Sequence, residues 1–219
     1  MGLLIGVVTG VFLGCTGAGG SIIAIPLLMY FAGLSLVDAS GLALGVVAIG
    51  SLFTAVSRSQ TGHEVLDWRL VFLLASTAVF TAPLGRWLSF QIPEFFLLSG
   101  FCLLVSYLAI RLWRCACDTP SPFKPGARLS YPLMLGGVAV GFLSGLFGVG
   151  GGFPIVPLLR FSGLAFDRAA SHSLAVVGLV SVVGFASHLG FAETVPPALL
   201  LEAAIGVVAG ISLGVTLAR

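Results

Sequence analysis

Charged residues are scarce in this chain. They make up 8% of the 219 residues, and ten Lys and Arg against eight Asp and Glu leave a formal net charge of only +2. A water-soluble domain normally carries about a quarter charged residues, so this composition excludes one. The small net charge, with no basic patch interleaved with aromatic residues, also excludes nucleic-acid binding.

Cysteine and histidine are also few, at four and three residues. The cysteines have no histidines at metal-ligand spacing, so we expect neither a metal centre nor a disulfide framework, and we interpret the pair Cys115-Ala-Cys117 as incidental. The chain contains no His-Glu-x-x-His motif and no paired intramembrane aspartates. We therefore expect no catalytic residue and no cofactor.

Apolar residues, by contrast, make up 58% of the chain and form nearly continuous runs. Five runs are long enough to cross a bilayer completely: residues 38–57, 69–89, 94–112, 169–188 and 197–217. The sequence therefore predicts an all-α, multi-pass protein of a cell membrane, in contact with the lipid bilayer. We expect this to be a bacterial inner membrane.

One motif occurs twice within the apolar sequence. Gly14-x-x-Gly17-x-Gly19-Gly20 precedes Pro26-Leu27-Leu28, and Gly145-x-x-Gly148-x-Gly150-Gly151 precedes Pro157-Leu158-Leu159. The flanking apolar arms, 2–15, 21–34, 132–147 and 153–165, would reach roughly 18 to 24 Å as helices. Because a hydrocarbon core is about 30 Å thick, we predict half-helices broken at the glycines, with Pro26 and Pro157 as structural hinges.

The repeated motif belongs to a longer internal duplication. At an offset of 131, ten of the 23 residues from 6 to 28 are identical to their counterparts. We predict a first transmembrane repeat over 1–112, a polar cytoplasmic linker over 113–130 and a second repeat over 131–219. The second repeat lacks a counterpart of 94–112, so we expect either a shortened chain or a further subunit, such as a second copy, on that face.

Each broken pair could cross the membrane once or fold back to its starting side. If each pair crosses once, the repeats are parallel and four arginines, 86, 160, 168 and 219, are stranded outside. If each pair folds back, the repeats are inverted and only Arg86 of the ten basic residues lies outside, which the positive-inside rule favours. Two short complete crossings per pair would give the same parity, so that alternative stays open.

The glycine segments are the strongest candidates for a binding site. Unwound backbone at membrane depth has to be buried in protein or line a polar cavity, and the start of a half-helix presents unpaired N–H groups with partial positive charge. The alternative is that the glycines only allow close helix packing. The anion-binding interpretation names Gly17, Gly19, Gly20, Ser21, Gly148, Gly150, Gly151 and Gly152.

Polar side chains near the half-helices extend this site. Ser171, His172 and Ser173 begin the helix after the second broken pair, and Ser40 occupies the comparable place in the first repeat. They could donate to an oxyanion, with His172 carrying a coupled proton; helix capping and an interfacial histidine are the alternative. Glu202 is interpreted as an interfacial residue or an ion-coupling site.

The chain resembles the TauE/SafE family of sulfite exporters. The resemblance rests on Gly10-x-x-x-Gly14-x-x-Gly17-x-Gly19-Gly20 with Pro26-Leu27-Leu28, on the second copy from Gly141 to Leu159, and on Pro83-Leu84-Gly85-Arg86. It implies a transporter of small anions such as sulfite, thiosulfate or sulfonates. The family often has a third glycine where this chain has Ser21, a departure that we expect to tune the site.

These observations predict a membrane transporter that binds a small anion between half-helix ends and moves it by alternating access. Coupling to protons or another ion would fit this reading. Two other classes stay open: an intramembrane enzyme, and a membrane scaffold subunit that docks a partner.

Overall fold

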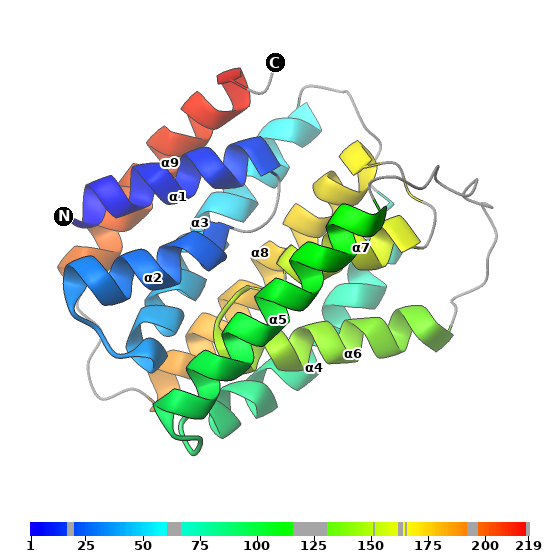
Figure 1. Cartoon of the computed structure of the whole chain (residues 1–219). Coiled ribbons are helices and arrows are strands. Elements are labelled where there is room, and N and C mark those ends of the chain that lie inside the picture. Colours follow the sequence, from blue (N-terminus) through cyan, green and yellow to red (C-terminus); the bar gives the residue numbers. More distant parts are fainter. Residues whose placement is uncertain are drawn as a thin grey trace.

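The computed structural model describes residues 1–16, 20–60, 67–115, 131–150, 152–161, 164, 166–191 and 197–217. All regular structure within these ranges is α-helical, which confirms the predicted all-α class (Figure 1). The helices are α1 Gly2–Thr16, α2 Gly20–Ala32, α3 Leu36–Gln60, α4 Trp68–Ser89, α5 Glu94–Cys115, α6 Tyr131–Phe147, α7 Gly152–Phe161, α8 Phe166–Phe191 and α9 Pro197–Leu217.

Helix lengths separate spanning helices from shorter ones. Four helices among the described residues are long and apolar enough to cross a membrane: α3, α4, α8 and α9. The fifth expected span, α5, has 22 residues but is not among these four, so its crossing stays a prediction. The chain is therefore a multi-pass membrane protein, as its composition predicts.

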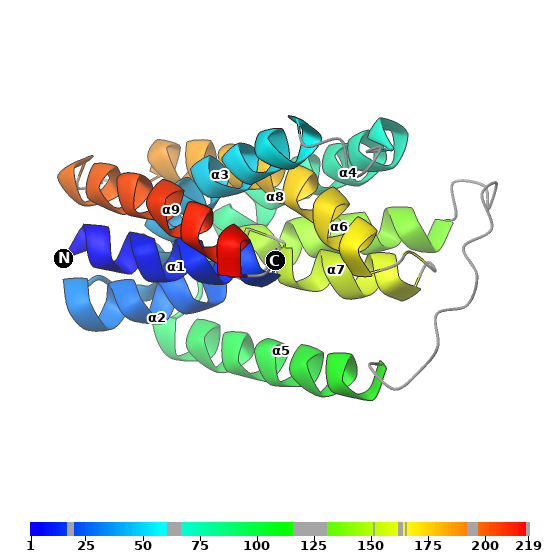
Figure 2. The same cartoon turned by 90° about the horizontal axis from the view of Figure 1, so that it is seen from above.

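The helices of the two glycine-broken pairs are shorter than the spanning helices, and the two helices of each pair are in contact. α2 has 13 residues and α7 has 10, so they reach about 20 Å and about 15 Å. Figure 2 shows α1 and α2 side by side at one end of the molecule and α6 and α7 at the other, each pair turning near the middle. Both the fold-back alternative and two short complete crossings per pair have this arrangement, so the choice between them and the inverted relation between the repeats stay predictions.

The prolines do not interrupt either half-helix. Pro26 lies inside α2 and Pro157 inside α7, and each helix continues past its proline. A proline removes one backbone donor without breaking the helix when its neighbours hold the rest in place. The breaks lie at the glycines alone, and a hinge role for the two prolines stays a prediction.

Close glycine contacts join helices from different parts of the chain. A methyl group at Gly6 would collide with the carbonyl of Ala203 in α9, and one at Gly210 with the carbonyl of Val7 in α1. In the same way, Gly141 and Gly145 of α6 lie against the backbone of α4 at Ala78 and Ala82. These glycines therefore allow close helix packing, as small residues do in membranes: α1 packs on α9, and α6 packs on α4.

Helices α3 and α8 lie between these two pairs and form the centre of the molecule. Their facing side chains are buried, among them Val47, Val176, Val177 and Val180, and they share one apolar core with α4 and α7. α5 lies along the outside (Figure 2), where its Phe101 ring packs 6.0 Å from that of Phe147, the last residue of α6. Residues 148–150 of the second glycine segment lie against both of these central helices.

Candidate functional site

The second glycine segment is an unwound connection buried in the protein. α6 ends at Phe147, and α7 begins at Gly152. Gly148 and Gly150 take φ values of 68° and 66°, a region that residues with a Cβ seldom adopt. The N–H of Gly148 donates to the carbonyl of Ser144 at 2.8 Å, which closes the last turn of α6.

The first turn of α2 touches this segment. Ser21, the second residue of α2, is 1% exposed, and its hydroxyl donates a hydrogen bond to the carbonyl of Val149. Gly20 is buried at the start of the same helix. The two copies of the glycine motif, 128 residues apart at this contact, therefore meet inside the fold. The predicted site residues Gly17, Gly19 and Gly151 lie outside the described residues.

α3 and α8 cover the second segment from two sides. Gly148 lies so close to Ser40 of α3 that an added Cβ would collide with the serine backbone and side chain. A Cβ at Gly150 would lie 2.6 Å from the Ser181 hydroxyl of α8. Ser181 is fully buried, and its hydroxyl has no hydrogen-bond partner among the described residues. Sequence reasoning missed Ser181 because nothing distinguishes it from serines that bond to their own helix.

The start of α7 is held by another predicted residue. The hydroxyl of Ser173 on α8 donates to the carbonyl of Gly152 at 3.3 Å, and both residues are buried. Ser171, two residues before Ser173, is also buried. The structure thus brings Ser21, Ser40, Ser173 and the second glycine segment together.

His172 is held by a different set of contacts. The backbone N–H of Asp67 donates to Nε2 at 2.9 Å, and Nδ1 donates to the carbonyl of Arg168 at 2.7 Å. Both ring nitrogens are therefore engaged by the protein, and the contact with Asp67 ties the start of α8 to the start of α4. A role for His172 in substrate binding or proton coupling stays a prediction; these contacts support the structural alternative.

Arg86, the one basic residue that charge counting leaves on the extracytoplasmic side, is buried in the protein. It is 0% exposed and lies in the last turn of α4. Nη1 donates to the hydroxyl of Ser40 at 2.7 Å, and Nη2 donates to the carbonyl of Val37 at 2.6 Å. Nη2 also contacts Nδ1 of His188. The sequence alone could have singled out Arg86, because an arginine within an apolar helix is rare and usually functional.

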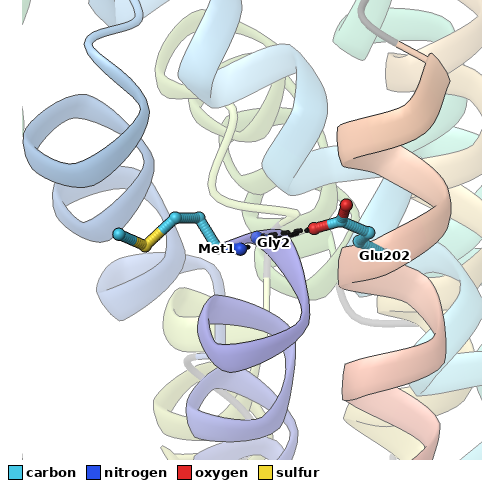
Figure 3. A network of polar contacts seen from close by, with 3 residues as sticks. All are labelled: Met1, Gly2 and Glu202. Atoms are coloured by element: carbon cyan, nitrogen blue, oxygen red, sulfur yellow. Dashed lines mark hydrogen bonds and ion pairs between the residues drawn. The ribbon is translucent and has the colours of Figure 1, made fainter.

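Glu202 links α9 to the start of α1 (Figure 3). One carboxylate oxygen, Oε2, accepts from the N–H of Gly2 at 3.0 Å and lies 3.5 Å from the amino group of Met1. The Glu202 side chain is half-exposed, at 50%. These contacts fit an interfacial capping role, while ion coupling through Glu202 stays a prediction.

Comparison with known proteins identifies relatives of this chain. The family model described as Sulfite exporter TauE/SafE matches residues 2–219. A "Probable membrane transporter protein" of Xylella fastidiosa strain 9a5c is 30% identical over 220 residues, covering 97% of this chain and 82% of the relative. A protein with the same name from strain Temecula1 is 32% identical over 180 residues, covering 79% of this chain and 67% of the relative.

A third relative, from Haemophilus influenzae, also carries that name and is 29% identical over 186 residues, covering 78% of this chain and 66% of the relative. No solved structure matches the chain. The match over residues 2–219 and the 30% identity to a relative of similar extent together confirm the resemblance read from the repeated glycine motif. The chain belongs to the TauE/SafE family and is a membrane transporter.

Proposed function

We propose that this transporter carries small oxyanions, sulfur-containing ones such as sulfite, thiosulfate or sulfonates among them, bound where the two glycine segments meet. The observation that carries this proposal is the contact between Ser21 of α2 and Val149 of the second segment. It brings two interrupted helix pairs to one buried place in a chain whose family is named for sulfite export.

The two helix starts near this contact supply backbone donors for a ligand. α2 begins at Gly20 and α7 at Gly152, and the first turns of helices carry N–H groups without intrahelical partners. Each helix start also carries about half a unit of positive charge. A small anion is therefore the ligand class that this backbone favours.

One side chain adds a donor at the same place. The Ser181 hydroxyl has no partner among the described residues and lies beside Gly150. A buried hydroxyl without a partner is costly, so a bound oxyanion that accepts its hydrogen bond would remove that cost. This supports a ligand at the glycine segments rather than packing alone.

The arrangement also supports alternating access. The α1–α2 and α6–α7 pairs reach the middle of the molecule from opposite ends (Figure 2), as in transporters whose repeats close a central site from either side. In this proposal the first repeat covers 1–112, the second covers 131–219, and the linker 113–130 is cytoplasmic. Rocking of α3 and α8 against the outer helices would open the site alternately.

Anion counterflow in proteoliposomes tests the function. The purified chain should exchange internal unlabelled sulfite for external radiolabelled sulfite under anaerobic conditions, with saturable kinetics. Thiosulfate and a short-chain sulfonate should compete, and an uncharged sulfone of similar size should not. Empty liposomes are the control, and an absence of saturable exchange with every small oxyanion would refute the proposal.

A further inference from the structure

Arg86 connects the ends of three spanning helices. It lies in the last turn of α4, and its guanidinium contacts Val37 and Ser40 near the start of α3 and His188 near the end of α8. The ring of Phe90 completes the surroundings, with its centroid 5.1 Å from Cζ of Arg86 and 6.0 Å from the stacked His188 ring. The His188 ring lies against Gly41, in space that a side chain at position 41 would fill.

The charge of Arg86 is not balanced at short range. Its hydrogen-bond partners are a hydroxyl, a carbonyl and an imidazole nitrogen, and no carboxylate of the described residues lies within 4.0 Å. Asp38, beside Val37, attracts it only from farther away. The Nε–H group is buried and has no partner in the part of the chain that the structure describes. A buried cation in this state is costly unless an anion joins it.

Ser40 joins this arginine to the glycine segments. Its hydroxyl accepts from Nη1 of Arg86, while its Cβ and carbonyl lie against Gly148. One serine of α3 thus touches the buried cation on one side and the unwound backbone on the other. The positive charge is placed at the edge of the region where both helix breaks meet.

We propose that Arg86 is the cationic residue of the anion site, adding a full positive charge to the partial charges of the helix starts and recognising oxyanions with its planar guanidinium. This rests on the proposed function and deepens it. Arginine suits the role because its fork of N–H donors matches the oxygen atoms of sulfite or sulfate. The anion would engage the unpartnered Nε–H and balance the buried charge.

Anion binding to the purified full chain tests this inference. Sulfite should stabilise the wild-type protein against thermal unfolding in detergent, and titration gives its Kd. Arg86→Gln should raise that Kd at least about tenfold, the effect expected for losing a charge-assisted hydrogen bond. Arg69→Gln is the matched control, because Arg69 is an exposed arginine at the other end of α4, and its Kd should stay within about twofold.

A second variant keeps the test decisive if Arg86→Gln does not fold. Arg86→Lys retains the positive charge but loses the planar fork, so the ratio of bromide Kd to sulfite Kd should fall at least about fivefold. An unchanged ratio in Arg86→Lys, or an unchanged sulfite Kd in Arg86→Gln, overturns the role of Arg86.

The two proposals fail in different ways. If wild-type protein exchanges sulfite and Arg86→Gln does so with the same KM, the inference about Arg86 is wrong while the proposed function stands. If wild-type protein neither binds nor exchanges any small oxyanion, the proposed function is wrong and the inference falls with it.

Discussion

Ser21 and Val149 are joined by a hydrogen bond from the serine hydroxyl to the valine carbonyl, across 128 residues of sequence. The donor lies in the first turn of α2, and the acceptor lies between the two positive-φ glycines of the second segment. Ser21 stands where the family often has a third glycine. Its side chain therefore makes a bond to the other half of the molecule that a glycine could not make.

Replacing Ser21 with alanine should lower the free energy of unfolding by about 1 to 3 kcal/mol, because a buried carbonyl loses its donor. Thermal or denaturant unfolding in detergent measures the change. Ser99→Ala is the control: Ser99 bonds to the carbonyl of Phe95 on its own helix, and its loss should change stability by less than about 0.5 kcal/mol. Equal stability of Ser21→Ala and wild-type protein would contradict the importance of this contact.

Gly150→Ala should be more damaging than Gly33→Ala. Both glycines have positive φ, 66° and 64°, so each substitution carries a backbone strain of about 1 to 2 kcal/mol. A Cβ at Gly33 meets nothing within 4 Å, whereas one at Gly150 lies 2.6 Å from the Ser181 hydroxyl. Unfolding midpoints of the two variants separate strain from steric conflict, and equal midpoints would show that the segment has room to relax.

Ser181→Ala should leave stability unchanged or slightly raised, since the hydroxyl has no hydrogen bond to lose within the described protein. Oxyanion exchange in proteoliposomes should nevertheless slow, because the substrate loses a donor. Ser51→Ala serves for comparison: Ser51 is also fully buried but donates to the carbonyl of Val47 on its own helix. Normal exchange by Ser181→Ala would remove Ser181 from the binding site.

The inverted relation of the repeats predicts the location of the connection between α8 and α9. A reporter fused after Glu193 should give an extracytoplasmic signal, and one fused within the linker 113–130 a cytoplasmic signal. The physical reason is the placement of basic residues on the cytoplasmic side. Cytoplasmic signals from both fusions would establish parallel repeats instead.

Much of the helical architecture was predictable from local sequence. The predicted arms 2–15 and 132–147 correspond to α1 and α6, and the predicted spans 69–89 and 197–217 correspond closely to α4 and α9. Apolar run length and glycine clusters carry this information because bilayer thickness and backbone sterics act locally. Even so, α7 ends at Phe161, four residues before the predicted boundary.

The contacts between distant helices were not predictable in the same way. Nothing near Ser181 or Arg86 in the sequence indicates that one lies beside Gly150 and the other beside Ser40. The glycines of the repeated motif also proved to serve two purposes. Gly141 and Gly145 allow α6 to approach α4, whereas Gly148 and Gly150 lie where the helix is interrupted. The sequence does not distinguish these two roles, because they depend on tertiary packing.

The reciprocal packing of α1 on α9 and of α6 on α4 has a consequence for assembly. Each portion of the chain on either side of residues 116–130 supplies the glycine-lined surface that the other portion needs. The small-residue face of each portion is buried by a helix of the other portion, so each portion needs the other to complete its packing. If the chain is divided into two polypeptides within residues 116–130, the two should therefore associate with each other in a bilayer.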